Sequence, residues 1–519
     1  MQTRRRFLKL SAATPLALAG SSMLGSLAGM NAQAMDTDGY KALVCVFLFG
    51  GMDCHDTVLP YDQASYNQYA AIRSSLLQSY AALPGGSSRS RQALLPLAPA
   101  SDISAGRQFA MPPQMSALHS LFGDGKAAIV GNVGPLLQPT DRTSLLNGSA
   151  PLPKRLFSHN DQQSTWMSFA PEGSQLGSGG RFGDVAANAS AHVNKSSSQI
   201  SLAGNTVFLS GEQVGPYQIG VDGVQSIYLL ERSGNGVPVA LEPVLRDHFS
   251  AAGADRNNLF ERDFIDLSQT SFAANDLLDA ALRTAPDFAT AFPASALGGQ
   301  LSAIARTISV RETLGASRQI FFIGLGGFDT HSAQAATLPA LQQDISDSIA
   351  AFYAATQEMG IANDVTTFTA ADFGRTLTVN GDGTDHGWGS HHFVVGGAVK
   401  GGDIYGDIPA PELEHAQDWG NGRLIPTVSV EQFAAPLGSW YALNQTELNQ
   451  SLPGLANFPD GGLDLFCPRA PRYRFAGFHL GTGRSQCGHA STPASTPGDA
   501  PPGQSGQGPG LLPVAAQPG

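Results

Sequence analysis

The sequence predicts an α/β fold in which helices cover a mostly parallel central sheet. Continuous apolar runs of strand length recur along the chain, as expected for strands buried on both faces of such a sheet. Stretches with apolar residues at helical spacing lie between several of these runs. This alternation is typical of α/β sheets, whose functional sites lie at the carboxyl ends of the strands.

The elements follow in chain order. The predicted strands are 42–49, 127–133, 319–325, 365–369 and 393–399. The predicted helices are 63–79, 115–122 and 333–359. The less regular middle, 196–311, begins with short β-like pieces at 200–202 and 206–209 and continues into stretches rich in Ala, Leu and Asp. We interpret it as an insertion or cap between the two halves of the sheet.

The first residues resemble an export signal. Segment 3–9 (TRRRFLK) has the twin-arginine pattern, an apolar stretch follows it, and 32–34 (AQA) offers a cleavage site. We therefore expect a signal peptide at 1–34, the twin-arginine export machinery as a partner, and a periplasmic or extracellular location. The apolar stretch is too short and too interrupted for a stable membrane span.

The remaining chain is acidic. The full sequence has a formal net charge of −12, and the predicted signal peptide contains four basic residues and no acidic one. Its removal leaves a net charge of about −16, which argues against nucleic acid or an anionic membrane as a partner. The main domain is expected at 35–466, followed by an extension at 467–519. From about 485 the extension is rich in Gly, Pro, Ser, Ala and Gln, a composition that predicts disorder.

Carboxylates and imidazoles cluster after two of the predicted strands. Asp329 and His331 follow the strand 319–325, and residues two apart in extended backbone face the same side. A second set lies between the last two predicted strands: Asp372, Asp385, His386, His391 and His392. We expect one composite site for a divalent metal, and the imidazoles favour zinc or manganese. In the second set, Arg375 is a candidate for steadying a phosphate or sulfate group.

Two further candidate site residues, Asp53 and Ser158, precede these clusters in the sequence. Asp53 follows the first strand through Gly50 and Gly51, which permit a tight turn that presents the carboxylate at the sheet edge. Asp53 is either a metal ligand or an ordinary turn residue. Ser158 begins a predicted helix, where it is either an N-cap or a nucleophile, because the helix dipole and a nearby cation favour the alkoxide.

Taken together, these segments resemble the bacterial family called domain of unknown function 1501. The resemblance covers roughly 40–466 and is carried by LFGGMD (48–53), SHNDQQ (158–163), GGFDTH (326–331), DFGRT (372–376) and GTDHG (383–387). It implies an alkaline-phosphatase-like three-layer sandwich, a fold shared with sulfatases and phosphomutases, whose members coordinate two metals at the strand ends. It also implies that Asp53 is the first-strand ligand, that Ser158 is the nucleophile, and that Asp329 and His331 hold one ion.

The resemblance leaves two alignments open for the remaining ligands. Either Asp385-His386-Gly387 has the superfamily's Asp-His-Gly role, or Asp372-Phe373-Gly374 occupies that strand end and His386, His391 or His392 is the last ligand. We prefer the second alignment because 368–372 ends a strand as the superfamily motif does. It places Phe373 where an imidazole is expected and leaves the second metal site incomplete.

The function implied by the resemblance is metal-dependent hydrolysis of phosphate or sulfate esters, with one or two ions and an anionic small molecule or polymer as substrate. The position of Phe373 favours an alternative, a non-catalytic periplasmic binding or assembly protein with a degenerate metal site. A module that binds one metal ion without turnover is a third possibility.

Overall fold

The computed structural model describes residues 39–83, 87–102, 105–188, 194–224, 241–250 and 258–468. The predicted signal peptide and nearly all of the predicted extension lie outside these residues. Within them, no helix combines the length and the apolar character that crossing a membrane requires.

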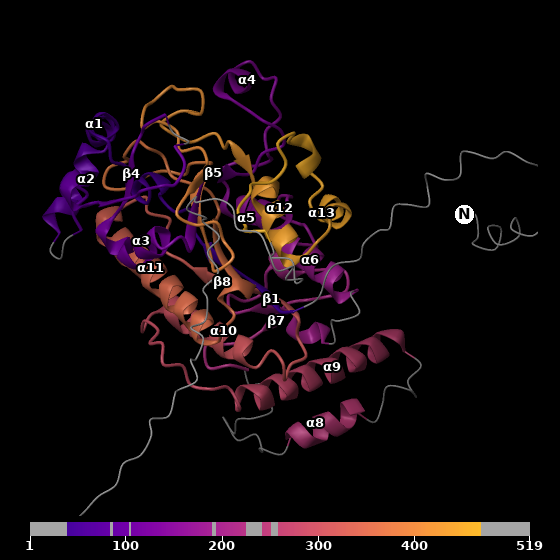
Figure 1. Ribbon diagram of the computed structural model, residues 1–519. Helices are drawn as coiled ribbons and strands as arrows, with labels where there is room; N and C mark the ends of the chain where they lie inside the picture. Colours follow the sequence, from indigo (N-terminus) through magenta and orange to yellow (C-terminus); the bar gives the residue numbers. More distant parts are fainter. Residues whose placement is uncertain are drawn as a thin grey trace, which may run out of the picture. The chain divides into compact units, whose positions relative to one another are not determined.

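A nine-stranded sheet lies at the centre of the fold (Figure 1). Its strands are β1 (Lys41–Leu48), β5 (Ala127–Gly134), β6 (Gln199–Ser201), β7 (Tyr217–Gln218), β8 (Arg318–Leu325), β9 (Val365–Ala371), β10 (Ser390–Gly396), β11 (Ile404–Gly406) and β12 (Val428–Ser429). Their order is β11-β5-β10-β9-β1-β8-β6-β7, and β12 also pairs with β5. Only β10 runs antiparallel to its neighbours. A small second sheet has the order β2 (Leu59–Pro60), β4 (Phe109–Met111), β3 (Leu95–Pro96).

Helices cover both faces of the sheet (Figure 1). The described helices are α1 (Gln63–Ile72), α2 (Ser74–Ala82), α3 (Ser116–Gly123), α4 (Arg142–Leu146), α5 (His159–Ser168), α6 (Ser178–Ala187), α8 (Leu241–Ser250), α9 (Leu259–Leu282), α10 (Ala296–Ser309), α11 (Gln334–Glu358), α12 (Val430–Tyr441) and α13 (Gln445–Ser451). Helices α3, α10 and α11 contribute to the core on one face, and α5, α6 and α12 to the core on the other.

Strand β1 shows why both faces are covered. All of its residues are buried, and successive side chains alternate between the two cores because a strand has a period of two. Val44 and Val46 belong to one core, whereas Leu43, Cys45 and Phe47 belong to the other. The predicted three-layer α/β architecture with a mostly parallel sheet is therefore confirmed.

The predicted elements agree with the structure apart from some details. Strand β10 covers 390–396 instead of 393–399, and the expected strand-like piece at 206–209 is a 3₁₀ turn because the Thr206 side chain accepts a hydrogen bond from the Phe208 amide. The predicted helix 63–79 is two helices, α1 and α2, which are separated at Arg73. In the irregular middle of the chain, β6 and β7 extend the central sheet.

Two glycines allow the loops at the carboxyl end of the sheet to meet. Gly50 and Gly51 follow β1 with φ angles of +110° and +86°. A Cβ atom on Gly50 would lie 2.3 Å from the Asp329 amide nitrogen, and one on Gly51 would lie 2.5 Å from the Phe373 ring. Only glycine combines this backbone conformation with so close an approach. The loops after β1, β8 and β9 are therefore in direct contact.

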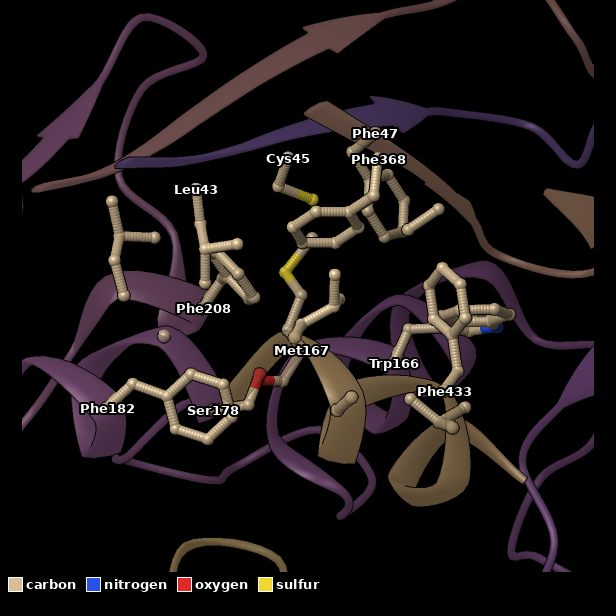
Figure 2. Close-up of a pocket in the computed structure, with 16 residues that line it drawn as sticks. Leu43, Cys45, Phe47, Trp166, Met167, Ser178, Phe182, Phe208, Phe368 and Phe433 are labelled. Atoms are coloured by element: carbon tan, nitrogen blue, oxygen red, sulfur yellow. The ribbon is translucent and has the colours of Figure 1, made fainter. Parts of the chain in front are cut away.

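An apolar cavity of about 30 Å³ lies beneath the sheet, between β1, β9 and helices α5, α6 and α12. Figure 2 shows Trp166 and Met167 of α5 pointing into it together with aromatic residues from the sheet and the other helices. No charged side chain lines the cavity. Its mostly apolar lining anchors α5 against the sheet.

Candidate metal centre

Asp329, in the loop after β8, lies among three imidazoles. Its Oδ1 is 3.1 Å from Nε2 of His331 and 3.1 Å from Nε2 of His386. Its Oδ2 is 3.5 Å from Nε2 of His159, and the Nε2 atoms of His331 and His386 are 2.9 Å apart. Three segments that are distant in the sequence thus bring together four side chains of the types that bind metal ions.

These side chains fit a divalent ion. His159, Asp329 and His386 each offer one ligand atom, and these atoms all lie within 4.8 Å of one another. Imidazole nitrogens with one carboxylate oxygen form a ligand set typical of zinc, and a three-ligand site leaves a position open for substrate. The Asp329 side chain is 44% exposed and that of His159 is 31% exposed, so the site can be reached from solvent.

His159 is positioned by a buried carboxylate. It is the first residue of α5, and its Nδ1 lies 2.6 Å from Oδ2 of Asp372, which directly follows β9. Asp372 is fully buried and also accepts hydrogen bonds from Gln163 Nε2 (2.9 Å) and the Gly50 amide (3.3 Å). The hydrogen bond to Asp372 raises the pKa of His159 above its usual value. A carboxylate that orients a ligating histidine through its other ring nitrogen is a recurrent feature of metal sites.

His386 is held by the backbone and by an aromatic ring. Its Nδ1 lies 2.9 Å from the carbonyl oxygen of Phe157. Because a carbonyl only accepts hydrogen bonds, Nδ1 carries the proton and Nε2 is free to coordinate. Partial burial lowers the pKa of His386, which favours the neutral ring that a metal requires. The buried ring of Phe373 packs against His386 and His159, with centroid distances of 4.4 Å and 4.9 Å.

His331 has a carboxylate partner of its own. Its Nδ1 lies 3.3 Å from Oδ1 of Asp385, which also accepts a hydrogen bond of 2.9 Å from Asn380 Nδ2. Partial burial opposes ionisation of Asp385, but the hydrogen bonds from Asn380 and His331 outweigh it and lower the pKa of Asp385. Asp385 therefore orients His331, as Asp372 orients His159.

Arg375 holds Asp329 in place. Its guanidinium has no exposed surface and donates through Nη1 to Asp329 Oδ1 (2.8 Å) and to the Gly50 carbonyl (3.3 Å). Nε and Nη2 donate to the hydroxyl and the carbonyl of Thr384. Partial burial would raise the pKa of Asp329, but the hydrogen bond and charge of Arg375 outweigh it and lower that pKa. Arg375 thus faces protein acceptors, and its placement does not favour the expected contact with a substrate anion.

The structure places three other predicted ligands away from this cluster. Asp53 is buried in a bidentate ion pair with Arg73. His391 and His392 are buried within β10, because that strand begins at Ser390 and not after the two histidines as expected. Burial lowers the pKa of His391 to about 4 and that of His392 to about 3.

The candidate nucleophile, Ser158, is the N-cap residue of α5, but its side chain makes no capping hydrogen bond. Its Oγ donates to Oδ2 of Asp161 at 2.9 Å. Of the predicted site residues, the structure brings together Asp329, His331, Asp372, Arg375, Asp385 and His386.

His159 and Arg73 were not among the residues that the sequence singled out for the site. His159 could have been noticed because it follows Ser158 in a segment that carries the family resemblance. Arg73 gave no such signal, since it lies in a predicted helix with no other site residue.

Comparison with protein families supports the resemblance over part of the chain. Residues 244–421 match the model of a family described as "Protein of unknown function (DUF1501)". This segment contains Asp329, His331, Asp372, Arg375, Asp385 and His386. No curated protein matches the chain.

Three solved structures resemble the protein distantly. Ps i-CgsB in complex with k-i-k-neocarrahexaose has 9% sequence identity and a TM-score of 0.33, over 81% of this chain and 77% of that one. A second structure of Ps i-CgsB has 8% identity and a TM-score of 0.30, over 80% of this chain and 77% of that one. A mutant of the alkaline phosphatase PafA has 11% identity and a TM-score of 0.21, over 65% and 64%.

Proposed function

We propose that this protein is a metal-dependent hydrolase-like protein that acts on phosphate or sulfate esters. The observation that carries the proposal is the convergence of Asp329 with His159, His331 and His386 at the carboxyl ends of the strands. Each of these side chains is held by a second group, which is the arrangement that a metal site needs to fix its ligands. The partial exposure of the cluster leaves room for an ester to approach.

The side chains of the centre have different roles in this proposal. His159, Asp329 and His386 would hold the ion, with His331 beside them, and the imidazole-rich set favours zinc or manganese. When bound, a divalent ion would polarise the ester oxygen and promote attack at phosphorus or sulfur. Asp372 orients one ligand of this set, and Arg375 holds Asp329.

Ser158 is the candidate nucleophile in this proposal. It lies next to His159 at the N-terminus of α5, where the helix dipole favours an anionic oxygen. Asp161 accepts the hydrogen bond from Ser158 Oγ and is therefore the side chain placed to take its proton.

Metal analysis followed by an ester screen tests the proposal. The protein is exported through its own signal, purified without chelators or a polyhistidine tag, and analysed by elemental mass spectrometry. We expect bound zinc or manganese and turnover of aryl phosphates or aryl sulfates. Asp329→Asn should lose both, whereas Asp460→Asn, at an exposed position elsewhere, should lose neither. A variant Asp329→Asn that kept its metal and its activity would exclude the proposed centre.

Export by the twin-arginine machinery belongs to the same proposal and is supported by the motif at 3–9. Replacing Arg4 and Arg5 together by Lys should retain the protein in the cytoplasm, as measured by cell fractionation. Replacing Arg6 by Lys is the matched control, which should leave export intact.

A non-catalytic binding or assembly protein is the second candidate function. The position of Phe373 favours it, because this ring packs against two of the imidazoles at a place where the resemblance leads one to expect a ligand. This candidate predicts no turnover of aryl phosphates or aryl sulfates with any divalent metal, and stable co-purification with an envelope protein.

A further inference from the structure

We propose that the buried guanidinium of Arg73 neutralises the carboxylate of Asp53, the role that a second metal ion would otherwise have. The centre therefore holds one ion, and Asp53 is not a ligand. This inference rests on the proposed function, in which the family resemblance leads one to expect Asp53 among the ligands of a two-ion site.

The carboxylate of Asp53 has no free acceptor position. Its Oδ1 accepts from Arg73 Nη2 (3.0 Å) and from the His55 amide (3.1 Å). Its Oδ2 accepts from Arg73 Nη1 (2.6 Å) and from Gln334 Nε2 (2.7 Å). An ionised carboxylate has about four lone-pair positions, and these four bonds use them. A metal ion could bind Asp53 only by displacing one of these donors, and while Arg73 stayed in place its positive charge would repel the ion.

Arg73 is itself held too firmly to be displaced. The side chains of Arg73 and Asp53 have no exposed surface. Besides its two bonds to Asp53, the guanidinium donates to the carbonyls of Leu377 (2.9 Å) and Thr376 (2.7 Å). A buried guanidinium that lost its carboxylate partner would be an uncompensated charge in the interior, which is strongly destabilising. The described surroundings therefore do not fit an ion at Asp53.

The ion pair still acts on the metal centre, through the backbone. The Thr376 amide donates to the carbonyl of Asp385 at 2.9 Å, and Arg375 forms a β-bridge with His386. Arg73 thus fixes the strand-like segment that pairs with the segment carrying Asp385 and His386. Arg73 and Asp53 are positioning residues for the centre and do not touch the ion.

The experiment measures both the number of ions and the stability of the metal-free protein. Full-length exported wild type is dialysed against Zn²⁺ alone, and bound zinc per chain is determined by elemental mass spectrometry. Asp53→Asn is compared with Asp329→Asn, since both replace a carboxylate by an amide of the same shape. We expect about one ion per chain in wild type and in Asp53→Asn, and loss of that ion in Asp329→Asn.

The Tm of the metal-free proteins shows whether Asp53 is the ion-pair partner of Arg73 or a metal ligand. Removing the partner of buried Arg73 should lower Tm by roughly 5 °C or more in Asp53→Asn. If Asp53 were instead a ligand whose ion had been removed, the same change would have little effect on Tm. If Asp53→Asn does not fold, Arg73→Lys replaces it, because lysine keeps the charge but cannot form the two parallel bonds. It should also hold one ion per chain, at a lower Tm.

The remaining outcomes distinguish a failure of the one-ion assignment from a failure of the proposed function. Two ions in wild type, with one lost in Asp53→Asn, would overturn the one-ion assignment and leave the proposed hydrolase intact. A metal-free Asp53→Asn as stable as wild type would also overturn it. No bound ion in wild type would overturn the proposed function together with the one-ion assignment.

Discussion

Nδ1 of His159 lies 2.6 Å from Oδ2 of Asp372, a carboxylate that is fully buried where β9 ends. The two residues are 213 positions apart in the sequence. Their contact directs the other ring nitrogen of His159 towards Asp329. The carboxylate thus sets both the orientation and the basicity of a proposed metal ligand.

Replacing Asp372 by Asn should weaken zinc binding about 10- to 100-fold, because the amide keeps the shape of the side chain but loses the charge that makes His159 a better ligand. The dissociation constant can be measured by competition with a chromophoric chelator. Asp364→Asn is the control, since Asp364 pairs with Lys41 at the opposite end of the strands. Equal affinities for Asp372→Asn and wild type would show that Asp372 does not act on the metal.

Zinc binding should release a proton from His159. Its raised pKa means that, without metal, the ring stays protonated somewhat above pH 6.5, whereas coordination requires a neutral Nε2. The affinity for zinc should therefore rise as the pH increases through this raised pKa, and it should fall as the pH drops below that pKa. Calorimetry in buffers of different ionisation enthalpy should detect proton release near neutral pH that disappears at higher pH and is smaller in Asp372→Asn, which keeps the imidazole but loses the carboxylate.

The same shift has the opposite effect on the metal-free fold. A histidine whose pKa is raised by folding stabilises the folded state below its unfolded pKa, and this contribution is lost as the pH rises through the folded pKa. The Tm difference between metal-free wild type and His159→Gln should therefore be largest near pH 6 and smaller at pH 8. A difference that grew with pH would contradict the assigned role of Asp372.

Replacing Ser158 by Ala tests the nucleophile. If Ser158 attacks the ester, the variant should lose turnover by a factor on the order of 10³ or more while keeping its metal. Ser164→Ala, in the same helix, is the control, because the Ser164 hydroxyl contacts that of Ser168 (3.5 Å), further along the helix and away from its start. Turnover within about tenfold of wild type would assign the attack to water instead.

Glu431 should make the fold less stable as pH rises. Burial near the start of α12 raises the pKa of Glu431 from 4.5 to about 7. Between these values the folded state binds more protons than the unfolded state, so the free energy of unfolding falls with increasing pH across this window. Glu431→Gln should raise Tm by several degrees at pH 8 and by much less at pH 5.

The exposed Glu312, whose side chain is 90% accessible, provides the matched control. Glu312→Gln should show no such difference between the two pH values. If Glu431→Gln behaved in the same way as the control, Glu431 would not be a buried acid.

The local sequence pattern was sufficient to predict most of the fold. The apolar run of β1 indicated a strand buried on both faces, and its alternating side chains do enter two cores. Asp329 and His331 could be placed together because they are close in sequence and follow a strand. In contrast, a shift of the start of β10 to Ser390 was enough to place His391 and His392 in the interior of the sheet.

The layered fold and the clustering of carboxylates and imidazoles after β8 and β9 can be predicted from the sequence, because they depend on periodicity and on neighbours along the chain. The contacts of His159 with Asp329 and of Asp53 with Arg73 arise from the folding of the chain and have no local sequence pattern. A carboxylate in a glycine turn has the same sequence pattern whether it binds a metal or an arginine. Its role depends on which positive charge lies against it in the folded chain. Here that charge belongs to Arg73, at the break between α1 and α2.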